Sequence, residues 1–102
     1  MATKIGKFFL KALNTNCEVY VANYLKPTTS KAIKLVYNDG NCIDTLSTNL
    51  PEFYSILKPN EFFVRGFSLL ESIREDCLSS GIFEYTGKSI VDTTKVEIWK
   101  LL

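Results

Sequence analysis

The chain has 102 residues, of which 46% are hydrophobic and 13% aromatic, and its formal net charge is +1. This length is typical of one domain, here residues 1–102, and so large an apolar and aromatic content excludes a disordered chain. The longest apolar run near the N-terminus, Phe8-Phe9-Leu10, lies between two lysines and is far shorter than the ~20 residues of a membrane span, so we expect neither a signal peptide nor a transmembrane helix.

Residues 4–13 fit two patterns. Their apolar residues recur at helical spacing with lysines opposite, but Phe9 and Leu13 also fit the alternation of a strand. We favour a strand that turns at residues 14–16. It would pair with a second strand at residues 17–25, a segment rich in β-branched and aromatic residues.

A hairpin is expected from the next two apolar segments, residues 32–37 and 42–48. The Asp-Gly pair at residues 39–40 between them is typical of a two-residue type I′ turn. Such a turn would pair Leu35 with Asp44 on one face, however. A three-residue loop with a glycine-associated bulge, or an edge position for Asp44, therefore stays open as an alternative.

A helix at about residues 69–79 is the clearest element. Apolar residues recur there every three or four positions, while charged and polar residues fill the opposite side. Ser68 followed by Glu71 is the S-x-x-E pattern of a helix start, and Gly81 is suited to the left-handed residue after a helix end.

Further strands are expected at residues 61–67, 82–86 and 95–101, which are rich in aromatic and β-branched residues. Together the elements predict an α+β fold. We expect one antiparallel sheet of five to seven strands, with the single amphipathic helix packed on one face.

Several catalytic chemistries are excluded by the residues that the chain lacks. It has no histidine, which removes Ser-His-Asp, Cys-His and His-ligated zinc sites. Cys17, Cys42 and Cys77 show no C-x-x-C spacing, and we expect them to pack as small apolar side chains. No glycine-rich phosphate-binding motif occurs. We therefore expect a protein that is not an enzyme and that uses no cofactor or metal.

Positive charge is concentrated near the N-terminus. Residues 1–34 hold six lysines against one acid and so carry +5, while residues 35–102 carry −4. The lysines either deter aggregation at strand edges or form a basic patch for nucleic-acid phosphates, with aromatic rings between them for unpaired bases. The candidate residues for this patch are Lys4, Lys7, Lys11, Lys31, Lys34, Tyr20 and Tyr24.

A second candidate surface is acidic. Glu71, Glu75 and Asp76 fall on the polar side of the expected helix, with Glu52 and Glu61 in the preceding segment. A solvated helix face is the simpler interpretation of this pattern. The alternative is a carboxylate surface that imitates nucleic-acid phosphates and binds a basic channel.

A series of short motifs runs from Tyr24 to the C-terminus: A-I-K-L-V at 32–36, the Asp-Gly turn, T-L-S-T-N-L-P at 45–51, P-N-E-F-F-V at 59–64, the helix ending at Gly81 and T-G-K at 86–88. In the order of these motifs the chain resembles a family of uncharacterised proteins of about a hundred residues from bacterial mobile elements and phages. The chain departs from the family at residues 92–95, where the family has a further turn and aromatic strand.

This resemblance implies a context more than a chemistry, since the family offers no catalytic residues. It implies a small interaction protein of a phage or mobile element, in the cytoplasm of the bacterial host. As its function we expect antagonism of a host defence or nuclease complex by protein–protein binding, as anti-CRISPR inhibitors do. The alternative is a nucleic-acid-binding module that uses the lysine-rich strands. We expect no membrane partner, and a monomer or homodimer.

Overall fold

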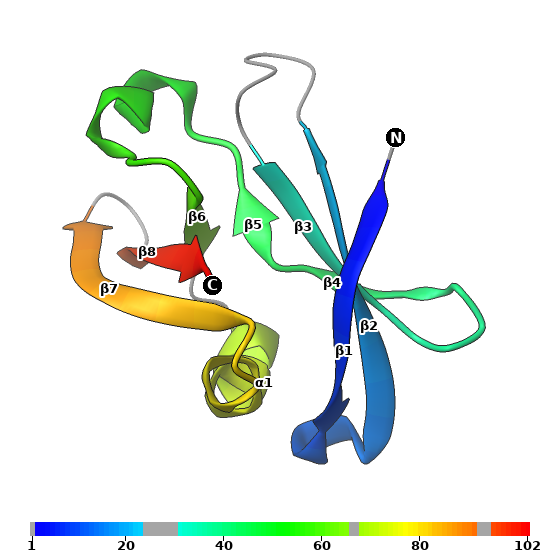
Figure 1. Cartoon of the computed structure of the whole chain (residues 1–102). Helices are drawn as coiled ribbons and strands as arrows, with labels where there is room; N and C mark the ends of the chain where they lie inside the picture. The colour runs from blue at the N-terminus through cyan, green and yellow to red at the C-terminus, as the bar shows by residue number, and fades with distance from the viewer. Residues whose placement is uncertain (1, 24–30, 66–67, 92–94) are drawn as a thin grey trace.

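The computed structural model describes residues 2–23, 31–65, 68–91 and 95–102. Within these residues the chain forms eight strands in two antiparallel sheets and one α-helix (Figure 1). The first sheet has the order β1 (Thr3–Leu10), β2 (Thr15–Asn23), β3 (Lys31–Val36), β4 (Cys42–Thr45). The second has the order β5 (Ser47–Thr48), β6 (Glu61–Arg65), β8 (Lys95–Leu101), β7 (Phe83–Val91). The helix is α1 (Ser68–Ser79), and two 3-10 turns are η1 (Lys11–Leu13) and η2 (Pro51–Ile56).

The α+β class with antiparallel strands is confirmed, but the expectation of one sheet with five to seven strands is wrong. The segment expected as one strand at residues 42–48 is divided at Leu46, whose side chain is buried. The backbone N–H of Leu46 donates to the carbonyl of Ile33 at 2.8 Å, and the N–H of Ile33 donates to the hydroxyl of Ser47, also at 2.8 Å. Ile33 thus holds the corner where the chain leaves the first sheet and enters the second.

Residues 3–10 form a strand, as we favoured over a helix, but the turn after it is formed by Lys11–Leu13 with Asn14 and not by residues 14–16. β1 and β2 form an antiparallel hairpin closed by η1, in which Asn14 adopts a left-handed conformation with φ 50° and donates its N–H to the carbonyl of Lys11. The register of the hairpin shifts between Lys4 and Gly6, which marks a β-bulge.

The second hairpin uses the three-residue loop. The N–H of Gly40 donates to the carbonyl of Tyr37 at 2.9 Å, and the N–H of Tyr37 donates to the carbonyl of Asn41 at 2.8 Å. Only Gly40 has positive φ in this loop, so the type I′ turn is wrong and a turn followed by a glycine bulge replaces it. Leu35 does lie opposite Asp44, which is tolerated because β4 is the outermost strand of its sheet.

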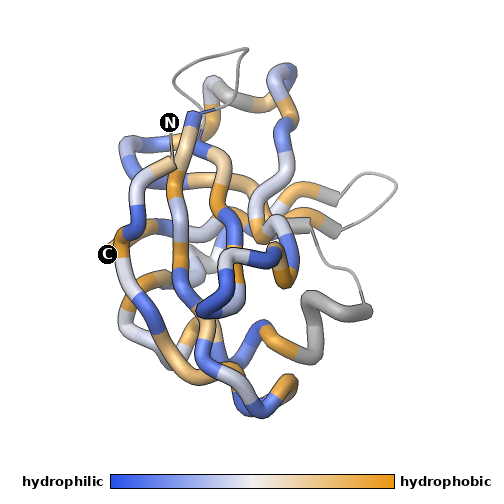
Figure 2. Tube along the Cα trace, turned by 90° about the vertical axis from the view of Figure 1, so that its right-hand side faces the viewer, coloured by the Kyte–Doolittle hydropathy of each residue, from blue (hydrophilic) through white to orange (hydrophobic). Residues whose placement is uncertain are grey.

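The main core fills the space between the two sheets. It is built from residues of both sheets and of α1, and its largest members are Trp99, Phe62 and Phe83, whose ring centroids lie 6.0–6.5 Å apart. Apolar and polar residues alternate along much of the chain, as Figure 2 shows, except in β6, where Phe62, Phe63 and Val64 are all buried. The alternation turns one set of side chains into this core.

The helix is confirmed, but it does not lie flat on a single sheet. α1 lies in the opening between β7 and the end of β1 with η1, and its residues Ile73 and Cys77 are fully buried in the main core (Figure 1). The side chains of Ser68 and Glu71, expected at the helix start, lie outside the described residues. The opposite face of the second sheet forms a smaller cluster of Phe63, Val96 and Ile98, which residues in and beside η2 cover.

Candidate functional site

A row of polar and aromatic side chains crosses the outer face of the first sheet. Lys4 of β1 lies opposite Tyr20 of β2, and Tyr20 in turn lies opposite Lys34 of β3. Lys34 lies opposite Thr45 of β4. Lys4, Lys34 and Thr45 are exposed and Tyr20 is half-buried. The register therefore places one tyrosine between two lysines on the solvent-facing side of the sheet.

The β-bulge brings a third lysine onto this face. Lys4 and Lys7 are three residues apart, so in a regular strand they would point to opposite sides of the sheet. The register shift between Lys4 and Gly6 adds the residue that corrects this, and Lys7 lies opposite Glu18, two residues before Tyr20. We call Lys4, Lys7, Tyr20 and Lys34, with Glu18 among them, the basic–aromatic face.

Glu18 is the acid on this face. Its carboxylate accepts a hydrogen bond from the ammonium of Lys4 at 2.6 Å and one from the hydroxyl of Tyr20 at 3.4 Å. The hydrogen bond to Lys4 lowers the pKa of Glu18, and the same contact raises the pKa of Lys4. Glu18 thus orients the Lys4 ammonium and the Tyr20 ring, and it balances one of the three positive charges.

Two of the expected basic residues are not on this face. Lys31 is half-buried and shares the side of β3 with Ile33 and Leu35, which face the core, so its assignment to the patch is wrong. Lys11 is exposed but lies on η1, beyond the end of β1. Tyr24 lies outside the described residues.

Two of the three carboxylates expected on the helix are described, and they have different partners. Glu75 is 85% exposed and forms an ion pair with Arg74 at 3.5 Å. Asp76 instead accepts a hydrogen bond from the backbone N–H of Ala12 at 3.1 Å, which ties α1 to η1. The side chain of Glu71 lies outside the described residues.

The two carboxylates of the preceding segment do not join Glu75. The side chain of Glu61 is only 6% exposed, because its carboxylate closes the turn into β6 by accepting the N–H of Lys58 at 2.9 Å and lies 3.4 Å from the ammonium of Lys88. Its assignment to an acidic surface is therefore wrong. Glu52 is exposed, but it lies on η2, over the opposite face of the second sheet from α1.

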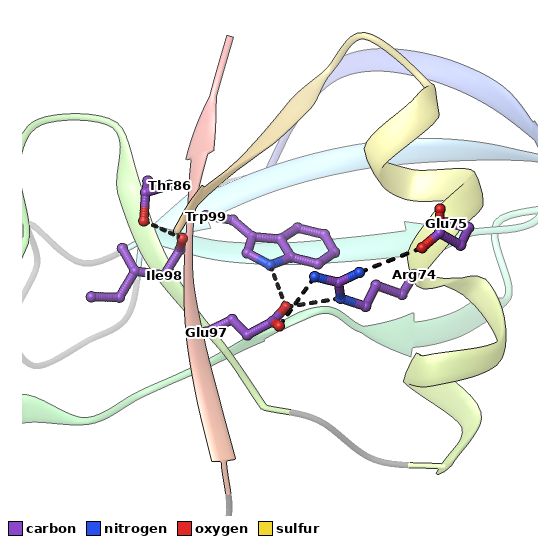
Figure 3. Close-up of polar contacts among 6 residues, drawn as sticks. All are labelled: Arg74, Glu75, Thr86, Glu97, Ile98 and Trp99. Atoms are coloured by element: carbon purple, nitrogen blue, oxygen red, sulfur yellow. Dashed lines mark hydrogen bonds and ion pairs between the residues drawn. The ribbon is translucent and has the colours of Figure 1, made fainter. Parts of the chain in front are cut away.

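Sequence reasoning missed a half-buried polar network. Arg74 of α1 donates from Nε and Nη2 to the two carboxylate oxygens of Glu97 at 3.0 and 3.1 Å, and the indole N–H of Trp99 donates to the same carboxylate at 3.0 Å (Figure 3). Glu97 raises the pKa of Arg74, chiefly through these hydrogen bonds. The Arg74 guanidinium also lies 5.3 Å from the ring centroid of Tyr85. This network fixes the helix to β8. The one sequence signal for it was the alternation that places Glu97 on the same side of β8 as Trp99.

Comparisons of the chain with protein-family models, with curated proteins and with solved structures find no match. The resemblance to the mobile-element family therefore stays a prediction.

Among residues 2–23, 31–65, 68–91 and 95–102, no helix has the length and apolar character needed to cross a membrane. Those same residues contain no cluster of three or more metal-ligating side chains.

Proposed function

We propose that this protein is a non-catalytic module that binds single-stranded nucleic acid through the basic–aromatic face. The observation that carries the proposal is the cross-strand row in which Tyr20 lies between Lys4 and Lys34. Neighbouring strands lie ~4.8 Å apart, so the two lysines flank the ring at about 10 Å from each other.

Each member of the row has a role in this proposal. The ammonium groups of Lys4, Lys7 and Lys34 pair with phosphates, which supplies affinity that does not depend on sequence. The Tyr20 ring offers a surface on which an unpaired base can stack, and such stacking contributes about 1–3 kcal/mol per base. A paired base cannot reach the ring, so the proposal favours single strands over duplexes.

The test is a fluorescence anisotropy titration with a labelled 12-nucleotide single strand and with the corresponding duplex. We expect micromolar affinity for the single strand at 50 mM salt and weaker binding to the duplex. Three phosphate contacts predict an affinity loss of about 20-fold between 50 and 200 mM salt. No binding at micromolar protein, or equal binding to the duplex, contradicts the proposal.

A matched pair of variants separates this face from general charge. Lys4→Glu with Lys34→Glu should weaken binding at least tenfold. Lys58→Glu with Lys100→Glu has the same net charge, but both of these exposed lysines lie away from the first sheet, and binding should change less than twofold. An equal loss in the two double variants would show that the face has no special role.

A second proposed function is antagonism of a bacterial defence or nuclease complex, as the resemblance implies. The observation that favours it is apolar exposure: Ile5 and Leu102 are 43% and 67% exposed. They border a groove of about 420 Å³ that Asn60, Gly81, Ile82 and Leu101 also line. Exposed apolar side chains around a groove are typical of protein–protein contacts.

This second function is tested by capture from nuclease-treated host lysate. The wild-type protein should retain a component of a defence or nuclease complex, and the variant Ile5→Lys with Leu102→Lys should lose it. Retention of that component by the variant, or no such component at all, contradicts antagonism through this groove.

A further inference from the structure

A second groove lies where the end of β1 and η1 meet the C-terminal half of α1. Its volume is about 350 Å³, within the range of small-ligand sites in proteins. We call it the β1–α1 groove, and the side chains that line it include Phe9, Lys11, Glu75, Asp76 and Ser79.

The two walls of the groove are held in place by a hydrogen bond between them. Asp76 on α1 accepts the backbone N–H of Ala12 on η1 at 3.1 Å. Beside this bond, Ser80 donates its hydroxyl to the carbonyl of Cys77 at 2.6 Å and accepts the N–H of Ile82 at 3.1 Å, which fixes the chain after the helix. The groove is therefore formed before any ligand arrives.

The walls carry three different chemical groups. Phe9 offers an aromatic ring that is 47% exposed. Lys11 is exposed and carries a positive charge, and Glu75 offers a carboxylate that is 85% exposed. A flat ring with N–H donors, attached to a phosphate, matches all three, because rings stack, carboxylates accept N–H bonds and ammonium groups pair with phosphates.

The groove also continues the basic–aromatic face. Phe9 lies two residues after Lys7 on β1, so both side chains project from the outer face of the sheet, about 7 Å apart along the strand. Lys11 follows Phe9 by two residues. A strand of nucleic acid that crosses Lys4 and Lys7 therefore reaches the groove without changing direction.

We propose that the β1–α1 groove binds one unpaired nucleobase that carries an exocyclic amino group, at an end of the nucleic-acid strand. This inference rests on the proposed nucleic-acid function. The base stacks on Phe9, its amino group donates to Glu75, and its phosphate pairs with Lys11. Adenine, cytosine and guanine have such an amino group, whereas thymine presents only carbonyl acceptors and a methyl group at those positions.

The experiment compares single strands that differ in one terminal base. Anisotropy titrations would use ten-residue oligothymidylate and the same strand with dA, dC or dG at the 5′ or the 3′ end. We expect the strands with an amino base at one end to bind at least fivefold more tightly than oligothymidylate. Glu75→Ala and Phe9→Ala should each remove this preference.

Glu52→Ala is the matched control, because Glu52 is also an exposed carboxylate but lies on η2. This variant should keep the full preference. Binding of oligothymidylate without any preference for an amino base, or a preference that survives Glu75→Ala, overturns the groove and leaves the basic–aromatic face intact. Absence of binding by every oligonucleotide overturns both.

Discussion

Two ion pairs of this protein have similar short distances and different surroundings. Lys4 and Glu18 meet on an exposed sheet face, whereas Arg74 of α1 reaches the half-buried Glu97 of β8. The side chain of Glu97 is 14% exposed, and it accepts from both the guanidinium and the Trp99 indole. Removal of the Glu97 carboxylate would leave a poorly solvated cation and a buried N–H donor without this acceptor.

We therefore predict that Glu97→Ala lowers the free energy of unfolding by about 2–4 kcal/mol, measured by urea denaturation. Glu97→Gln keeps an acceptor for the indole and should lose less. Glu18→Ala is the control, since water and salt screen that pair, and its unfolding midpoint should stay close to that of the wild type. Equal midpoints for Glu97→Ala and Glu18→Ala would show that the network does not stabilise the fold.

The three cysteines differ in environment, contrary to the expectation that all three are packed. Cys17 and Cys77 are fully buried in the main core, whereas Cys42 is exposed on the edge strand β4. Burial raises the pKa of Cys17 to about 11 and that of Cys77 to about 12. Both buried thiols are therefore protonated at neutral pH as well as shielded from reagents.

This difference predicts a labelling pattern. Treatment of the native protein with N-ethylmaleimide at pH 7.5 should add one label, at Cys42, within minutes. The other two cysteines should react only in denaturant, which peptide mass spectrometry can show. Rapid native labelling of Cys77 would mean that α1 does not pack as the structure places it.

Among the elements, the corner between β4 and β5 joins the two sheets. The hydroxyl of Ser47 accepts the N–H of Ile33, and both residues are buried. We predict that Ser47→Ala lowers the free energy of unfolding, measured by urea denaturation, by about 1–3 kcal/mol, because it leaves the buried N–H of Ile33 without this acceptor. Ser89→Ala on the exposed side of β7 should stay within about 0.5 kcal/mol of the wild type. A loss at Ser47 no larger than at Ser89 would contradict this role for the corner.

Elements whose formation depends on residues close together in the sequence could be predicted from it. The helix follows from its apolar periodicity, and the hairpin at residues 37–41 from its Asp-Gly pair. The division of residues 42–48 has no such local cause, because it depends on hydrogen bonds that join Leu46 and Ser47 to Ile33, more than ten residues earlier in the chain. The sequence therefore predicted residues 42–48 as a single strand flanking the Asp-Gly turn, and hence a single sheet.

The candidate site was predicted in part for a similar reason. The alternation of side chains along a strand can suggest which lysines share a face, but a bulge reverses it. The bulge near Gly6 brings Lys4 and Lys7 onto the same face. In β3, which has no bulge between them, Lys31 and Lys34 are three residues apart and therefore point to opposite faces. Glu61 was misassigned because its burial follows from the turn that it closes, which its own segment does not reveal.

In the whole molecule, the two sheets differ in what covers them. The second sheet packs on the main core with one face and on residues of η2 with the other. The first sheet packs on the main core with one face, and the outward side chains of Lys4, Lys7, Phe9 and Lys34 are exposed. The basic–aromatic face is therefore open to a partner in solution, whereas η2 covers the outer face of the second sheet.

The buried thiols also make the stability of the whole molecule depend on pH. Cys17 and Cys77 keep their protons in the folded state up to about pH 11 and 12, whereas a thiol in the unfolded chain loses its proton near pH 8.5. Above that pH the unfolded state binds fewer protons than the folded state, so the free energy of unfolding falls as pH rises. The contribution of the protonated thiols to the free energy of unfolding is complete below about pH 8.5. It is lost progressively as the pH rises to the pKa values of the folded state.

At pH 10 the loss amounts to about 2 kcal/mol for each buried thiol. We predict that the free energy of unfolding of the wild type, measured by urea denaturation, falls in this way between pH 7.5 and pH 10. In Cys77→Ala the fall should be smaller by about 2 kcal/mol, whatever the effect of the substitution on the free energy of unfolding at pH 7.5. Cys42→Ala is the control, because its thiol is exposed in both states, and it should leave the fall unchanged. The rest of the chain is the same in all three proteins, so the difference between variants reports the thiol. An identical pH dependence in Cys77→Ala and the wild type would mean that the thiol of Cys77 is not held in the core.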